Sequence, residues 1–174
     1  MRSEVPSVHE VLARAYVKKG DFDDAAAEMK RVIALTPRNE DAYYRLGLIF
    51  LQQKQPTKAQ DIFSQLLKVD PNSVEGHAGL ANVFADQHQN LAALNEYKRV
   101  AAADPGYQSV NYNMGVMEAR LNLYDDAIAS LLKQRQNGDD ADNENLLAEV
   151  YAAKGMKSEA DDARRRAGEL QASH

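Results

Sequence analysis

A regular interval of about 34 residues runs through this chain and constrains its fold more than any other feature. Pro37, Pro71 and Pro105 stand 34 residues apart (71 − 37 = 34; 105 − 71 = 34). Small residues recur at nearly the same spacing in two series, which are Ala13, Gly47, Ala81, Gly115 and Ala148, and then Ala25, Ala59, Ala93, Ala127 and Ala160. A unit of this length cannot bury a core alone, so the pattern predicts units that stack on their neighbours.

The stretch 40–73 shows what one unit contains. Its first half has the i, i+3, i+4, i+7 spacing of an apolar helical face, at Ala42, Tyr43, Leu46, Ile49 and Phe50. Pro56 suits the first turn of a second helix. The second half places on one face Ala59, Ile62, Phe63, Leu66 and Leu67. Asp70-Pro71 ends this helix, because a residue before proline is driven out of the helical region. The stretch therefore predicts two helices folded back on each other.

These residues resemble the tetratricopeptide repeat (TPR) family, whose unit is a helix–turn–helix of about 34 residues. The resemblance is carried by Leu46-Gly47, Phe50, Ala59, Phe63, Leu66 and Pro71, and before them by Leu12-Ala13, Tyr16, Gly20, Ala25 and Pro37. It covers nearly the whole chain. It implies an all-α fold, a right-handed superhelical α-solenoid of five antiparallel helix–turn–helix hairpins. We expect a single TPR domain over residues 1–174, with repeats at about 6–39, 40–73, 74–107, 108–140 and 141–174.

The fourth and fifth repeats depart from the pattern. Glu118 stands where the other repeats have an aromatic residue. We expect its carboxylate to tilt outward or to pair with a basic group; the alternative is a polar anchor for a ligand. The fourth repeat is one residue short, and Asn137-Gly138-Asp139-Asp140 replaces its Asp-Pro end, so we expect a longer or looser turn there. The last helix is mostly polar, with Arg164 at a normally apolar position, as a capping element requires.

Catalytic and metal-binding patterns are weak in this chain. The net charge of −5 argues against a nucleic-acid partner, and the absence of cysteine excludes disulfides and thiolate sites. His9 and His77 belong to no HExxH motif. The acidic run 138–144 lacks the ligand spacing of a calcium loop, so we interpret it as a solvated turn. We therefore expect no enzyme, no metal and no cofactor.

The sequence also bears on location. The segment MRSEVPSVHE has no apolar run that could serve as a signal peptide, and no stretch approaches the roughly 18 apolar residues of a membrane span. We expect a soluble protein of the cytoplasm and no membrane contact. The periplasm is the alternative if a signal sequence has been removed.

The TPR resemblance implies that the first helix of each hairpin lines a concave groove that holds a peptide. The expected groove residues are Arg14, Lys18, Tyr44, Leu48, Leu51, Asn82, Tyr112, Asn113, Val116 and Arg120. The apolar members form open patches unless curvature of the solenoid tucks them against the adjacent repeat. Asn82 and Asn113 resemble the backbone-holding asparagines of chaperone-tail-binding TPR domains.

The basic residues that grip a terminal carboxylate in those domains are missing, because their positions hold Ala78, Asp142 and Leu146. The wider groove carries six acids and three bases, which are Glu10, Asp41, Glu75, Asp86, Asp142 and Glu149, and Arg14, Lys18 and Arg120. We therefore expect a protein–protein interaction module whose peptide or amphipathic-helix partner is neutral to mildly basic and partly apolar. The alternatives are a self-associating assembly scaffold, hence a homo-oligomer, and the TPR arm of a larger protein.

Overall fold

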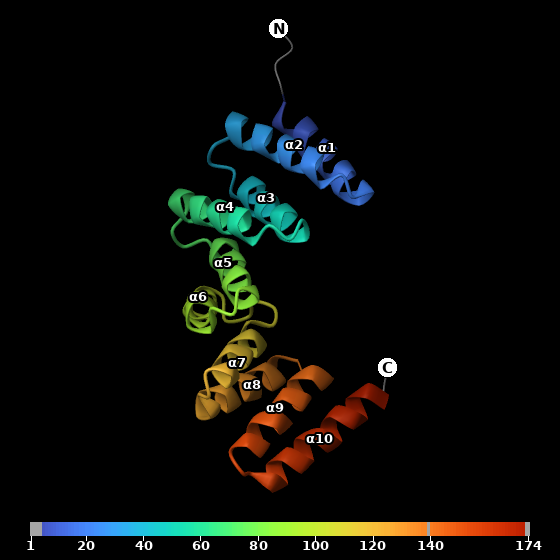
Figure 1. Ribbon diagram of the computed structural model, residues 1–174, viewed down its shortest axis with the longest axis vertical. Coiled ribbons are helices and arrows are strands. Elements are labelled where there is room, and N and C mark those ends of the chain that lie inside the picture. Colours follow the sequence, from blue (N-terminus) through green and yellow to red (C-terminus); the bar gives the residue numbers. More distant parts are fainter. Residues whose placement is uncertain (1–4, 139, 173–174) are drawn as a thin grey trace. The chain divides into compact units, whose positions relative to one another are not determined.

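The structure is a computed structural model that describes residues 5–138 and 140–172. These residues form ten α-helices and no strand (Figure 1). In chain order the helices are α1 (Pro6–Lys19), α2 (Phe22–Leu35), α3 (Glu40–Gln52), α4 (Pro56–Val69), α5 (Val74–Asp86), α6 (Asn90–Ala103), α7 (Val110–Arg120), α8 (Tyr124–Asn137), α9 (Ala141–Ala153) and α10 (Lys157–Ala172). The expected all-α fold of five helix pairs is confirmed.

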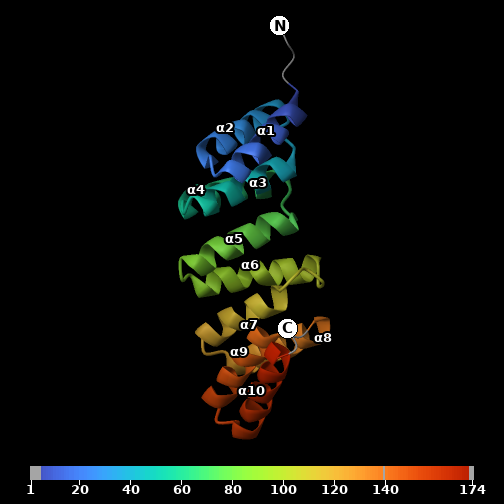
Figure 2. The ribbon, with the colours of Figure 1, turned by 90° about the vertical axis from the view of Figure 1, so that its right-hand side faces the viewer.

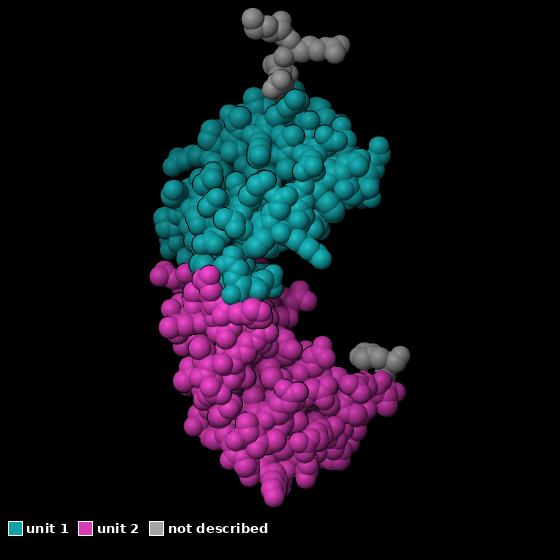
Figure 3. Space-filling view, in the orientation of Figure 1, with its two compact units in different colours: residues 1–87 teal, residues 88–174 magenta. Residues whose placement is uncertain are grey.

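The backbone groups into two compact units, residues 1–87 and 88–174 (Figure 3). Unit 1 holds α1 to α5, and unit 2 holds α6 to α10. Within each unit every helix packs on the next one along the chain. The pairs α1–α2 and α9–α10 lie side by side in both ribbon views (Figures 1 and 2). The single domain and the superhelical sweep of the whole chain stay predictions.

Short local signals set the helix ends. Gly20 ends α1 in the left-handed conformation at φ 83°, which favours glycine. Pro56 occupies the first turn of α4, where no intrahelical N–H bond is lost. The Asn39 side chain accepts a hydrogen bond from Ala42 N at 3.1 Å, which caps α3. These helix-ending and helix-starting residues keep the turns short, so that successive helices run antiparallel.

The core follows the small-residue series. Every alanine of the second series is buried, and Ala59 is fully so. The Phe63 ring lies beside Gly47 of α3 and Gly79 of α5, where an added Cβ would come within 2.4 Å and 2.5 Å of the ring carbons. A side chain at either glycine would therefore push α4 away from its neighbours. The prediction that small residues allow the helices to approach closely is confirmed.

The expectation that Glu118 tilts outward or pairs with a basic group is wrong. Its residue surface is 2% exposed, and Ser130 Oγ of α8 donates a hydrogen bond to its Oε2 at 2.7 Å. Burial raises the pKa of the Glu118 carboxyl, while the Ser130 hydrogen bond and the positive charge of Lys98 act in the opposite direction. A hydroxyl on the facing helix therefore satisfies this carboxyl inside the core.

Of the longer or looser turn expected after the fourth repeat, the longer turn is wrong, and the looser one stays a prediction. Only residues 138–140 separate α8 from α9, whereas 104–109 separate α6 from α7. Asp140 holds the short turn by accepting a hydrogen bond from Asn143 N at 2.7 Å. Asp139 lies outside the described residues. Asp140 thus caps α9 as Asn39 caps α3.

The last helix has an apolar inner face and a charged outer face. Its buried residues are all alanines, namely Ala160, Ala163 and Ala167. On the outside Arg164 pairs with Asp161 at 2.7 Å, and Arg165 with Glu169 at 3.0 Å. The polar outer surface expected of a capping helix is present.

Candidate functional site

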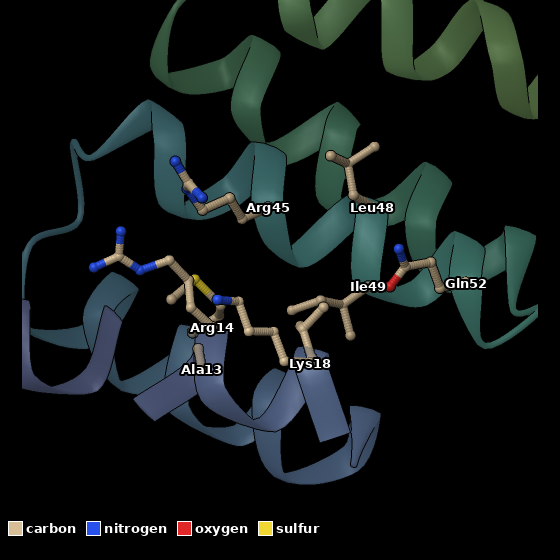
Figure 4. Close-up of a pocket in the computed structure, with 9 residues that line it drawn as sticks. Ala13, Arg14, Lys18, Arg45, Leu48, Ile49 and Gln52 are labelled. Atoms are coloured by element: carbon tan, nitrogen blue, oxygen red, sulfur yellow. The ribbon is translucent and has the colours of Figure 1, made fainter. Parts of the chain in front are cut away.

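A pocket of about 270 Å³ opens between the first helices of repeats one and two (Figure 4). We call it the α1–α3 pocket. Its lining residues are Ala13, Arg14, Val17, Lys18, Met29, Arg45, Leu48, Ile49 and Gln52. All of them belong to unit 1. Figure 4 shows Arg14 and Lys18 on α1 and Arg45, Leu48 and Ile49 on α3, with the Ile49 side chain pointing toward α1.

The fold creates this hollow because α2 packs on both α1 and α3. Met29 of α2 is buried and supplies part of the floor. Ala13 is too short to fill the space above it, and Ile49 is buried on the opposite wall. Leu48 remains 36% exposed at the mouth. The result is an apolar cleft open to solvent, which is the usual form of a site for an apolar side chain.

The mouth of the pocket is basic. Arg14 and Lys18 lie one turn apart on α1, and neither has a hydrogen bond or ion pair within residues 5–138 and 140–172. Arg45 Nε donates to Asp41 Oδ2 at 2.5 Å, and this hydrogen bond raises the pKa of Arg45. Arg14 and Lys18 can therefore both donate hydrogen bonds to a carboxylate of a ligand that binds on the apolar floor.

A second, acidic hollow lies at the other end of α3. It is lined by Glu40, Asp41, Tyr44, Leu66, Ser73 and Glu75, all in unit 1. Tyr44 is half-buried, with its ring centroid 6.2 Å from that of Phe63. The surface of unit 1 thus changes from basic to acidic along one helix.

The expected open patch of Tyr44, Leu48 and Leu51 reduces to one exposed side chain. Leu51 is half-buried and packs against the core, as Tyr44 does. The alternative weighed from the sequence, that these side chains tuck against neighbouring helices, describes both of them. Asn82 lies exposed on α5. Of the six predicted residues in unit 1, the pocket brings together Arg14, Lys18 and Leu48.

The predicted residues of unit 2 all lie on α7. Tyr112 and Val116 are half-buried, as is Asn113, while Arg120 is exposed at the end of the helix. Burial raises the pKa of the Tyr112 hydroxyl, and so do the negative charges of Asp142, Asp140 and Glu149. Asn82 and Asn113 belong to different units, so their pairing stays a prediction.

Sequence reasoning missed Arg45. It follows Asp41 by four residues on α3, and this spacing favours an exposed ion pair on a helix. That signal was present in the sequence, but it gave no reason to place Arg45 beside α1. The pocket needed the packing of three helices before it could be seen.

Within the part of the chain that the structure describes, no three His, Asp or Glu side chains group closely enough to hold a metal ion. Among the same residues, no helix has the length and apolar character needed to cross a bilayer.

The repeat geometry agrees with a comparison of the sequence with known families. The sequence model of the family described as "Tetratricopeptide repeat" matches residues 11–74 and 78–142. The chain belongs to the tetratricopeptide repeat family. Among curated proteins, this TPR chain is 33% identical over 97 residues to the type IV pilus assembly protein PilF of Pseudomonas aeruginosa. The match spans 56% of the chain and 38% of PilF.

Other similarities are more distant. The BBSome complex member BBS4 homolog of Drosophila melanogaster is 23% identical over 123 residues, which span 70% of the chain and 25% of that protein. The chain thus spans well under half of these relatives. A solved MamA structure from Desulfovibrio magneticus RS-1 has a TM-score of 0.89 at 17% identity and covers 97% of this chain and 96% of that one. YrrB, described as a TPR protein with an unusual peptide-binding site, has a TM-score of 0.80 at 19% identity, covering 93% and 84%. These two likenesses concern the fold.

Proposed function

We propose that this TPR protein is a non-enzymatic interaction module that binds a peptide or amphipathic helix of another protein through unit 1. The observation that carries the proposal is the α1–α3 pocket, an open apolar cleft whose mouth holds Arg14 and Lys18, two cations without an ion pair among the described residues. Apolar burial supplies affinity in such a site, and the charges orient the ligand. The pocket lies on first helices, which agrees with the groove that the TPR resemblance implies.

The pocket favours a particular ligand pattern. A leucine, methionine or phenylalanine side chain fits the apolar floor, while an adjacent aspartate or glutamate pairs with Arg14 or Lys18. Farther along α3, the acidic hollow around Glu40 and Glu75 favours a lysine or arginine of the same segment. A partner with both features is close to neutral overall, and this refines the neutral to mildly basic ligand expected from the sequence.

A role in assembly is the second candidate. The relative PilF is named a type IV pilus assembly protein, and its match spans 56% of this chain. An assembly protein of this kind would use the same pocket on a subunit of the structure that it helps to build. Self-association of the chain is the other form of this candidate.

A display selection tests the proposal. Random twelve-residue peptides displayed on phage are selected on the immobilised chain, and enriched peptides are synthesised and measured by fluorescence anisotropy. We expect enrichment of an apolar residue next to Asp or Glu. Leu48→Ala should weaken binding about tenfold, the effect of losing a hot-spot contact worth roughly 1.4 kcal/mol. The double change Arg14→Ala and Lys18→Ala should remove most of the salt dependence.

Leu123→Ala is the matched control, because Leu123 is an exposed leucine of unit 2 far along the chain from the pocket residues. It should leave the affinity unchanged. Peptides that bind equally well to the Leu48 variant, the cation variant and wild type would show that the pocket is not the binding site.

A further inference from the structure

One ion pair joins the α1–α3 pocket to the acidic hollow. Arg45 lines the pocket, and Asp41 lines the hollow at the other end of α3. The two residues lie one turn apart, and Arg45 Nε donates a hydrogen bond to Asp41 Oδ2 at 2.5 Å. The Arg45 side chain is 47% exposed and that of Asp41 is 55% exposed. A ligand in either cavity can therefore reach the member of the pair that lines it.

The pair sets Asp41 in competition with an acidic ligand. In the free chain the Asp41 carboxylate occupies the Arg45 guanidinium, and its hydrogen bond is the largest cause of the raised pKa of Arg45. A ligand carboxylate in the pocket meets Arg14 and Lys18 at once, but it has to displace Asp41 before it gains Arg45. Asp41 thus lowers the affinity of the pocket for a ligand that is only acidic.

The acidic hollow offers a basic side chain the means to remove that competition. Glu40 and Glu75 line it, and across residues 5–138 and 140–172 neither carboxylate has an ion pair or a hydrogen bond. The half-buried Tyr44 ring and Leu66 form an apolar wall for the methylene stem of a lysine or arginine. A cation held there attracts Asp41, and Arg45 is released to the pocket.

We infer that the α1–α3 pocket and the acidic hollow are two halves of one site, coupled through the Asp41–Arg45 pair. Its ligand is a segment of a partner protein that carries an apolar residue with an adjacent acid at one end and a lysine or arginine at the other. The inference rests on the proposed function and adds that the two charges of the ligand strengthen each other's binding. Because exposed ion pairs are weak, this coupling amounts to at most about fivefold in affinity.

The length of α3 between the two halves sets the spacing of the ligand's charges. Asp41 and Leu48 are seven residues apart on one helix, a rise of about 10 Å. An extended peptide covers that distance in about three residues. Short peptides in water are not stably helical, so the extended spacing applies to a peptide probe. Arg45 lies between Asp41 and Leu48, which places the acid of the ligand between its apolar residue and its base.

A set of four peptides tests the coupling. The parent carries an apolar residue, a glutamate next to it and a lysine three residues from the apolar residue, with the glutamate between them. In the other three, glutamine replaces the glutamate, the lysine or both. Fluorescence anisotropy with the intact chain gives the four affinities. We expect the two charges together to improve wild-type binding by threefold to fivefold, roughly, more than the product of their separate effects.

Asp41→Asn should remove this excess, because no aspartate then holds Arg45. It should also tighten binding of the glutamate-only peptide, again by up to about fivefold. Glu40→Gln is the matched control, since it removes the same charge from the same first turn of α3 without touching the pair. It should leave the affinity for the glutamate-only peptide within about twofold of wild type. Combining Arg45→Gln with Asp41→Asn should cancel the gain, and circular dichroism checks that each variant is folded.

The outcomes separate this inference from the proposed function. The coupling is overturned if Asp41→Asn changes neither the excess nor the glutamate-only affinity. It is overturned too if Glu40→Gln tightens binding as much as Asp41→Asn, because general charge attraction then explains the gain. In both cases the proposed function stands as long as Leu48→Ala still weakens the parent peptide. If Leu48→Ala weakens none of the four peptides, the proposed function and this inference both fail.

Discussion

At the scale of single residues, Phe63 links three helices. Its fully buried ring lies against Gly47 on one side and Gly79 on the other, and Tyr44 packs at its edge. Both glycines sit inside helices, where glycine is otherwise unfavourable by roughly 1 kcal/mol relative to alanine. Glycine is nevertheless favoured at positions 47 and 79, because only glycine allows α4 to approach α3 and α5 this closely.

Gly47→Ala tests that explanation. Although alanine is the better helix former, its Cβ would meet the Phe63 ring, so we expect a net loss of about 1–3 kcal/mol in the free energy of unfolding. Urea denaturation measures it. Gly168→Ala is the control, because no atom lies near an added Cβ there and the change should stabilise slightly. Equal stabilisation by both changes would contradict the packing argument.

Glu118 predicts a pH dependence. Because burial raises its pKa, the folded chain holds this proton more tightly than the unfolded chain does. The associated stability is complete below the ordinary value of 4.5 and is lost as the pH rises through the folded-state pKa. Glu118→Gln carries no charge and can still accept the Ser130 hydrogen bond. Its melting temperature should exceed that of wild type at neutral pH, and the difference should vanish below pH 4.5. A difference independent of pH would contradict the assignment.

At the scale of elements, an ion pair joins α8 to α9. Arg135 donates through Nε to Glu144 Oε1 at 2.5 Å and through its Nη2 to Oε2 at 2.7 Å. The Glu144 side chain is completely buried, whereas that of Arg135 is partly exposed. This fork joins the two helices at the point where the fourth repeat is one residue short, beside the Asp140 cap that begins α9.

Removing the arginine should be costly. Arg135→Ala leaves the Glu144 carboxylate buried without its cation, and we expect a loss of about 3–5 kcal/mol in urea denaturation. The double change Arg135→Met and Glu144→Leu should recover much of that loss. Arg165→Ala removes an exposed pair of α10 and should change stability by less than about 1 kcal/mol. A small effect of Arg135→Ala would show that Glu144 finds another partner.

The sequence predicted the elements of this fold well because their causes are local. Pro56, Gly20 and the small-residue series act through backbone geometry and spacing, which can be read without tertiary structure. The burial of the Glu118 side chain could not be predicted, because its hydrogen-bond partner Ser130 lies on a different helix. The α1–α3 pocket depends in the same way on three helices, so Arg14, Lys18 and Leu48 were found singly and Arg45 was missed.

At the scale of the whole molecule, the chain consists of TPR helix pairs, and within each of its two units successive helices pack on one another. The outer face of α10 is charged, whereas Val8 and Leu12 of α1 are exposed apolar residues. Repeat architecture determines where surfaces lie, and individual side chains decide what binds to them.

The central proposal is that a partner segment binds at the α1–α3 pocket, and NMR of the isotope-labelled chain tests it most directly. A peptide from the display selection is titrated while the backbone amide signals are recorded. We expect the largest shifts at residues 13–18 and 45–52, with the amides of α10 unchanged and the shifts absent in the Leu48→Ala variant at the same peptide concentration. Shifts confined to other helices, or shifts of the same size in the Leu48→Ala variant, would contradict the proposed site.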